Sequence, residues 1–151
     1  MSRIIAFAWT TPALLAGAKT CTRRDWDPAY AQSFKEGQEV FAYNRSPRAR
    51  GVHVATLRLT QKPRYEPLVD MPDSDYDCEG FRWYSNHPES LTKTVEGMPR
   101  NHFIEKVCSW EGFLRWRHSG ESMYTVRFEL LDITPDGESV KRSLEALEAH
   151  N

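Results

Sequence analysis

The chain has 151 residues, of which 40% are hydrophobic and 27% charged, and these are the proportions of one globular domain rather than of a disordered chain. No apolar run reaches the roughly 20 residues of a membrane span, so no membrane partner is expected. The net charge of −1 conceals an asymmetry, because residues 1–65 carry eleven Lys and Arg against four Asp and Glu, and residues 66–151 carry nine against seventeen. A domain that is basic on one side can bind a polyanion such as RNA, although folding can also mix the two halves on one surface.

The first half of the chain predicts short strands around one short helix. Residues 4–9 are apolar and typical of a buried strand. Thr11 and Pro12 predict the start of a helix and Gly17 its end, because a hydroxyl residue caps a helix, Pro fits its first turn and Gly follows its last. Residues 19–24 continue directly from this helix end, and apolar and polar residues alternate over 39–43 and 52–60. These patterns predict three further strands, with a bulge in the last.

The second half predicts one long strand, two helices and two irregular segments. The Pro-containing stretch 63–78 and the stretch 85–100 show little periodicity, and the second is the expected mobile insertion. Residues 103–117 carry an apolar stripe at helical spacing. Residues 123–133 alternate as a strand does, and residues 138–150 predict a terminal helix.

This order of elements predicts an α+β fold. We expect a small, mostly antiparallel β-barrel decorated with helices over residues 1–134. A turn at 134–137 then leads to a C-terminal helix over residues 135–151, which packs on the barrel or extends from it.

The cysteines and histidines predict neither a disulfide framework nor a metal site. Cys21, Cys78 and Cys108 are odd in number and widely spaced, and no CxxC occurs. We therefore expect reduced thiols in a cytoplasmic protein. The five histidines show no HxH or HxxxH spacing, and no Gly-rich phosphate loop or Rossmann fingerprint occurs, so no metal and no cofactor are expected.

One motif carries a resemblance to a known family. Gly17–Arg24 reads Gly-Ala-Lys-Thr-Cys-Thr-Arg-Arg, of the form Gly-x-Lys-x-x-x-x-Arg, and lies between a predicted short helix and a polar loop. This arrangement resembles the signature of ASCH-domain proteins, a family of the PUA-like superfamily. Residues 79–81 (Glu-Gly-Phe) resemble a further family motif, and residues 113–116 and 123–130 resemble its closing helix and strand. The resemblance extends over about residues 4–132.

The resemblance implies a β-barrel with a cleft beside the first helix. Family members have been associated with RNA binding, a compact bacterial subgroup hydrolyses the amide of N4-acetylcytidine, and some members have been linked to ribonuclease activity. The catalytic Lys, Thr and Glu of that subgroup fall on Lys19, Thr22 and Glu79. The segment 82–108 is longer than in compact members, and Gly37-Gln38 replaces the usual Gly-Asp turn. The longer segment is expected to reshape the cleft.

The chemistry of amide hydrolysis sets a geometric demand on the three residues. Thr22 would be the nucleophile, Lys19 its base if burial favours the neutral amine, and Glu79 the group that donates or shuttles a proton. Residues 19 and 22 point to opposite faces of a regular strand, so the chain must bend between them. The alternatives are a Lys19 that contacts phosphate, a Thr22 bonded to backbone and a Glu79 that is solvated beside the acidic loop.

A binding module needs less than an enzyme does. Phosphates prefer Arg and Lys, and unstacked bases prefer aromatic faces. The residues that offer these groups around the motif and in the basic loop 44–51 are Trp9, Lys19, Thr20, Arg23, Arg24, Tyr43, Arg45, Arg48 and Arg50. The aromatic residues could instead lie in the core, Arg24 could pair with an acid, and the loop could be a solvated turn.

The sequence thus favours an ASCH-like domain that binds RNA or a modified nucleoside around Lys19–Arg24. Two enzymatic alternatives stay open, an amidohydrolase of N4-acetylcytidine-type nucleosides and a metal-assisted ribonuclease. A protein-interaction domain without a nucleic-acid ligand is the remaining one. Fold alone does not choose among them, because function depends on the site.

Overall fold

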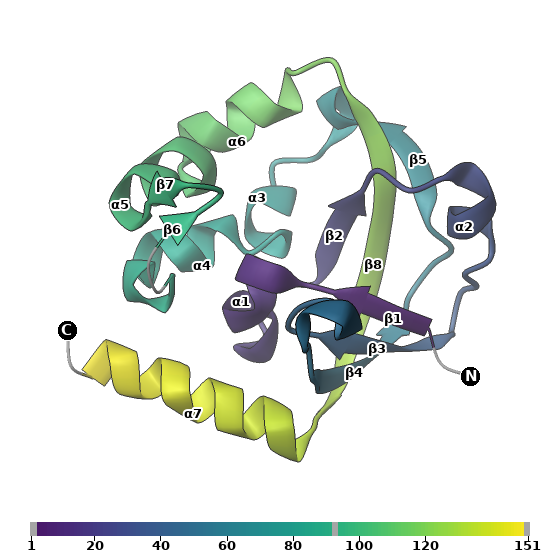
Figure 1. Ribbon diagram of the computed structural model, residues 1–151. Helices are drawn as coiled ribbons and strands as arrows, with labels where there is room; N and C mark the ends of the chain where they lie inside the picture. The colour runs from purple at the N-terminus through teal and green to yellow at the C-terminus, as the bar shows by residue number, and fades with distance from the viewer. Residues whose placement is uncertain (1–2, 92–93, 150–151) are drawn as a thin grey trace.

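The computed structural model describes residues 3–91 and 94–149 and has a curled, half-barrel sheet at its centre (Figure 1). The strands lie in the order β1-β3-β4-β8-β2, and β5 also pairs with β8. Their bounds are β1 (Arg3–Ala6), β2 (Cys21–Arg24), β3 (Glu39–Tyr43), β4 (His53–Leu59), β5 (Arg64–Pro67) and β8 (Ser122–Ile133). Only the β1–β3 pair of this sheet is parallel among the described strands, so the expected mostly antiparallel α+β fold is confirmed.

The long strand β8 gives the sheet its curl. Its second half pairs with β4, and its first half pairs with β2 and with β5. The register of the β4–β8 pair shifts between Thr56 and Leu57. This irregularity lies in the segment where the sequence predicts a bulge, and a bulge bends a strand and increases its twist.

In Figure 1 most of the helices lie on one side of the sheet, α7 runs along its lower edge and α2 lies on the opposite side. The α-helices are α1 (Thr11–Leu15), α2 (Pro28–Gln32), α3 (Asp75–Cys78), α4 (Phe81–Asn86), α5 (Arg100–Phe103), α6 (Trp110–Arg117) and α7 (Pro135–Ala149). Short 3-10 turns are η1 (Ala8–Thr10), η2 (Pro47–Ala49), η3 (Leu68–Asp70) and η4 (Pro88–Ser90), and η5 (Ile104–Cys108) is a π-helical turn. A hairpin of β6 (Thr94–Val95) and β7 (Met98–Pro99) lies beside α5.

The predicted continuous helix over 103–117 is in fact broken. Ser109 has an extended backbone, with φ −77° and ψ 162°, and its hydroxyl accepts a hydrogen bond of 3.0 Å from the backbone N–H of Gly112. Ser109 therefore caps a new helix, α6, and the π-helical turn η5 absorbs the change in direction.

Several expected boundaries also change. The stretch 63–78 is not irregular, because β5 pairs with β8 there and α3 ends it. The stretch 85–100 contains η4 and the β6–β7 hairpin, and its residues 92–93 lie outside the described part. The turn predicted at 134–137 is largely helical, because the terminal helix begins at Pro135, the first residue of the predicted C-terminal segment. Residues 150–151 lie outside the described part as well. Within the described residues no helix is long and apolar enough to cross a membrane.

Two hydrophobic clusters position the site. The first lies on the concave sheet and α1, with Leu14, Val40 and Leu57 fully buried. Its partly buried neighbours include Val140 of α7, so the C-terminal helix packs on the barrel. The second lies among α3, α4, α5 and α6 and includes Phe113. Where the β1–α1 connection passes between these clusters, the packing leaves a cavity.

Candidate nucleoside-binding site

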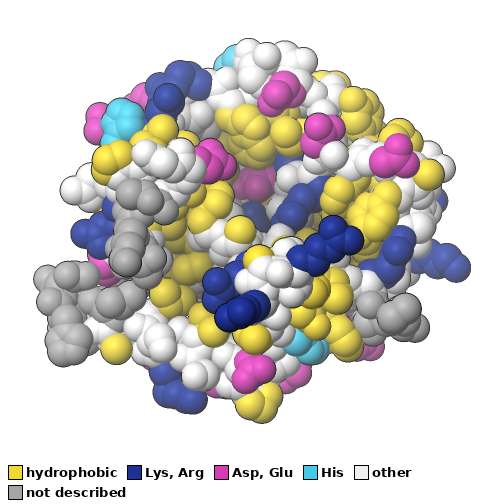
Figure 2. All heavy atoms as spheres, viewed as in Figure 1, with side chains coloured by type: hydrophobic (Ala, Val, Ile, Leu, Met, Phe, Trp, Pro, Cys, Tyr) yellow, Lys and Arg dark blue, Asp and Glu magenta, His cyan; other side chains and the backbone are white. Residues whose placement is uncertain are grey.

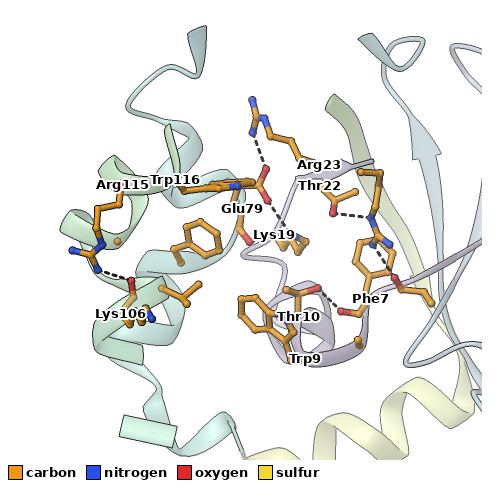
Figure 3. A pocket seen from close by; sticks show the side chains of 16 residues that line it. Phe7, Trp9, Thr10, Lys19, Thr22, Arg23, Glu79, Lys106, Arg115 and Trp116 are labelled. Carbon is orange, nitrogen blue, oxygen red and sulfur yellow. Dashed lines mark hydrogen bonds and ion pairs between the residues drawn. The ribbon is translucent and has the colours of Figure 1, made fainter. Parts of the chain in front are cut away.

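The cavity has a volume of about 570 Å³ and opens between the sheet and the helices of the second cluster. Figure 2 shows it as a hollow with charged side chains at its floor and hydrophobic surfaces around it. Its wall comes from four segments: residues 6–10, residues 19–24, residues 79–81 and residues 106–116. Figure 3 shows the side chains that line it.

The bend required of the motif is present. Gly17 has φ +75°, a left-handed conformation that ends α1 and turns the chain toward the sheet. β2 then begins only at Cys21, so Lys19 lies before the strand and Thr22 within it. Both side chains line the cavity. The irregular backbone before β2 thus brings together two residues that a continuous strand would separate.

Lys19 and Glu79 form the centre of the site. Lys19 is 2% exposed and Glu79 3%. The Lys19 Nζ donates to the backbone carbonyl of Glu79 at 2.9 Å and to its Oε1 at 3.3 Å. Gly80 lets its segment approach α1 closely, since a Cβ at this residue would stand only 2.9 Å from the Cβ of Ala13. Its φ of +93° also favours glycine.

A chain of ion pairs holds the Glu79 carboxylate in place. Arg23 donates to Glu79 Oε2 at 2.7 Å and to Asp75 Oδ2 at 2.5 Å, and the guanidinium of Arg127 donates to both Asp75 oxygens at 3.0 and 2.8 Å. Burial raises the pKa of Asp75, but the hydrogen bonds from Arg127 and Arg23 outweigh it and lower that pKa overall. Burial likewise lowers the pKa of Arg23, while the charges of Glu79 and Asp75 raise it overall. Asp75, Arg23 and Arg127 are therefore charged at neutral pH.

Thr22 and Arg24 form the other end of the polar floor. The Arg24 Nε donates to Thr22 Oγ1 at 3.2 Å, and an Arg24 terminal nitrogen donates to the carbonyl of Ala6 at 2.8 Å. Burial lowers the pKa of Arg24. The possible pairing of Arg24 with an acid is not found among the described residues. Its donation leaves the Thr22 hydroxyl proton available and would stabilise negative charge on that oxygen.

Aromatic rings form the walls. Trp9 and Phe81 are stacked at a centroid distance of 6.4 Å, and Phe81 meets Trp116 edge-on at 5.7 Å. Phe7 closes the side next to Arg24. In Figure 3 Trp116 lies above and Trp9 below the Lys19 side chain. Both tryptophans are half-buried, so each keeps ring surface for a ligand.

The structure separates the expected site residues into two groups. Trp9, Lys19, Thr22, Arg23, Arg24 and Glu79 all line the cavity. The residues that do not line it are Thr20, Tyr43, Arg45, Arg48 and Arg50. Tyr43 stacks on His53 at 5.9 Å, and the three arginines lie in the loop around η2. The basic loop is thus a surface feature, distinct from the cavity lining.

Sequence reasoning missed part of the lining. Phe7 and Thr10 lie close to the recognised Trp9, whereas Lys106 lies within the longer segment 82–108, and Arg115 and Trp116 follow it. Trp116 belongs to the recognised closing helix, so that helix gave a signal for it. Arg115 belongs to the same helix, whereas no local pattern marks Lys106.

The remaining chemistry-bearing groups are cysteines. Cys21, Cys78 and Cys108 are free thiols. Cys21 donates to Glu79 Oε2 at 3.4 Å. The neighbouring Cys21 side chain is the largest cause that lowers the pKa of the Cys78 thiol, to about 6. Over residues 3–91 and 94–149, no three His, Cys, Asp or Glu side chains are grouped as metal ligands.

Comparisons with known proteins show the fold. No protein-family model matches the sequence, and no curated protein matches it. A solved structure that does match is protein EF3133 from Enterococcus faecalis V583, described by the family model DUF984. The TM-score is 0.53 at 17% sequence identity, over 89% of this chain and 83% of the other. At this level of identity the match shows that the two chains share a fold.

Proposed function

We propose that this protein binds a nucleoside, free or as an unstacked residue of RNA, in the cavity around Lys19. One observation carries the proposal: a single cavity of about 570 Å³ combines aromatic walls with a buried, hydrogen-bonding floor. Ligand pockets in proteins typically measure roughly 300–1,000 Å³, with a mostly apolar lining and a few fixed polar groups. A flat heterocycle with polar edges has the complementary chemistry.

The two kinds of lining have separate roles in this proposal. The base stacks on the ring surface of Trp116, and its polar edge meets Thr22, Lys19 and Glu79. Stacking on an aromatic side chain contributes about 1–3 kcal/mol per base, so removal of one ring weakens binding strongly. The fixed ion pairs of Glu79 orient the polar floor before the ligand arrives, which reduces the entropy cost of binding.

A titration tests binding directly. Cytidine is added to the purified protein and its heat of binding is measured for the wild type and for Trp116→Ala. We expect saturable binding, weakened at least about fivefold in the variant. Tyr65→Ala is the matched control, because Tyr65 is 63% exposed and lies outside the cavity. Equal affinity in wild type and Trp116→Ala would contradict this binding mode.

A second candidate, hydrolysis of N4-acylated cytidine, is favoured by a specific contact. Lys19 Nζ and Glu79 Oε1 are 3.3 Å apart, within reach for proton transfer, and Thr22 lines the same cavity. A proton that moves from the Lys19 ammonium to the Glu79 carboxylate leaves a neutral amine and a carboxylic acid. The pair then holds a base and an acid side by side.

The proposed reaction uses both the Lys19 amine and the Glu79 carboxylic acid. Thr22 Oγ1 attacks the acyl carbon and gives its proton to the Lys19 amine, and the donated hydrogen bond from Arg24 stabilises the charge that develops on that oxygen. The Glu79 acid protonates the leaving amine as the C–N bond breaks, which releases cytidine. Water then hydrolyses the Thr22 ester, returns a proton to Oγ1 and releases the carboxylic acid.

Turnover of N4-acetylcytidine tests the reaction. We expect cytidine and acetate from the wild type, and a loss of at least about 100-fold in Thr22→Val and Lys19→Met. Thr60→Val and Lys35→Met are matched controls on exposed residues outside the cavity. Binding of N4-acetylcytidine without turnover would leave the first proposal in place and reject the second.

A further inference from the structure

Positive charge exceeds negative charge around the cavity. Five cationic side chains line it, Lys19, Arg23, Arg24, Lys106 and Arg115, against the single carboxylate of Glu79. Lys19 and Arg23 are paired with Glu79, and Arg23 also with Asp75. The surplus therefore resides on the other three cations.

The Arg24 guanidinium already donates hydrogen bonds to Thr22 and to the Ala6 carbonyl. Lys106 and Arg115 are the two remaining cations. Arg115 donates to the backbone carbonyl of Lys106 at 2.9 Å, which holds the two cationic residues together. Across residues 3–91 and 94–149, neither forms an ion pair with a carboxylate. Figure 3 shows both on the opposite side of the cavity from Thr22 and Phe7.

Two adjoining, exposed cations without an acidic partner attract an anion from solution that can neutralise them. The nearest acids do not do so. Glu105 and Glu111 line a neighbouring depression together with Lys106 and Arg115, and they form no ion pair with them. The cavity face of the two cations is therefore open to an anionic group of a ligand.

We infer that the ligand of this cavity is a nucleotide, whose phosphate binds at Lys106 and Arg115 while its base occupies the aromatic part. The inference rests on the proposed nucleoside binding and names its substrate class. The guanidinium of Arg115 has the planar donor geometry that suits phosphate oxygens, and the Lys106 ammonium adds a point charge. A cavity of about 570 Å³ leaves room beyond a base for a sugar and a phosphate.

The test compares cytidine with cytidine 5′-monophosphate on the wild type, Lys106→Gln, Arg115→Gln and the double variant. A partly exposed contact between opposite charges raises affinity a few-fold, so the two together predict a preference of about tenfold for the monophosphate. Each single variant is expected to reduce the preference about threefold and the double variant to abolish it, with cytidine affinity unchanged. Arg64→Gln, an exposed arginine outside the cavity, should retain the full preference.

Salt and chain length complete the test. Raising the salt concentration should reduce the preference for the monophosphate and leave cytidine affinity constant, because only the phosphate contact is screened. A dinucleotide that binds no more tightly than the monophosphate identifies a free nucleotide as the ligand, and one that binds much more tightly contradicts this in favour of an RNA strand. Equal affinity for cytidine and the monophosphate would overturn the inference alone. Absence of binding by both would overturn the proposed nucleoside site as well.

Discussion

The buried carboxylate of Asp75 offers the sharpest test of how the site is held together. Asp75 is 1% exposed, and it accepts hydrogen bonds from Arg23 and from both terminal nitrogens of Arg127. Asp75→Asn keeps the size of the side chain but removes its charge, and it turns an amide N–H group toward two donors. Glu79 is the only other carboxylate that Arg23 contacts among the described residues.

The loss in the free energy of unfolding caused by Asp75→Asn depends on which charges lose their partner. Breaking a buried ion pair typically costs about 3–5 kcal/mol. Here Arg23 keeps Glu79, and the Arg127 side chain is 30% exposed and can recover some hydration. We therefore expect the lower end, a loss of about 3 kcal/mol in the free energy of unfolding. For a domain of this size that is a fall of about 10 °C in the melting temperature.

The pH dependence has a defined sign. The pKa of Asp75 is lowered in the folded state, so its contribution is fully present above the ordinary carboxylate range and is lost as the pH falls through the folded pKa. The difference between wild type and Asp75→Asn should consequently be constant near neutrality and shrink below about pH 4.

Urea unfolding at several pH values measures both quantities. Asp77→Asn is the matched control, because it is the same substitution in the same helix at a carboxylate that is 56% exposed and paired with Arg82. It is expected to cost less than about 1 kcal/mol. If Asp75→Asn destabilised the protein no more than Asp77→Asn does, the ion-pair chain behind Glu79 would not have the structural role described.

Three further predictions follow from other features. Because the neighbouring Cys21 side chain lowers the pKa of Cys78 to about 6, iodoacetamide should modify Cys78 with a rate midpoint near pH 6. Cys21, whose pKa is raised, should stay protected, and mass spectrometry of a single modified site checks this. Gly80→Ala should cost about 2 kcal/mol, measured by urea unfolding, because φ is +93° and the added methyl group meets α1, and unchanged stability would contradict the close approach. Glutamine in place of the loop residues Arg45, Arg48 and Arg50 should weaken the binding of a single-stranded RNA at low salt and leave cytidine affinity unchanged. Equal RNA affinity in that variant would show that the loop does not contact RNA.

The sequence predicted the motif region of the fold well. Gly17 ends α1, β2 lies within the expected extended segment, and β3 has the expected bounds. These features depend on local chemistry, such as the glycine after a helix and the alternation of a strand. The long strand β8 was visible for the same reason.

Elements that depend on distant partners were not visible. β5 carries two prolines at or near its ends and becomes a strand only through its pairing with β8. α2 begins at Pro28, and its Asp27 cap accepts from a backbone N–H at 3.1 Å, yet the segment reads as a polar loop. Ser109 is a local helix-start signal that the continuous apolar stripe of 103–117 concealed.

The site residues also divide into those that could be recognised in the sequence and those that depend on distant contacts. Lys19, Thr22 and Glu79 were found through the resemblance, since no spacing rule joins residue 79 to residues 19 and 22. The partnership of Arg23 with Asp75 was missed because it joins β2 to a helix more than fifty residues away. The excess of arginines in the first half of the chain identified a basic loop but not its position relative to the cavity, because charge counts carry no spatial information.

The most direct test of the central claim is a nitrogen-15 NMR titration of the protein with cytidine. The account predicts that saturating cytidine shifts the indole N–H signals of Trp9 and Trp116 and the amide signal of Thr22, because all three residues line the cavity. An unchanged spectrum at millimolar cytidine, or shifts confined to residues 45–50, would contradict a nucleoside site at Lys19.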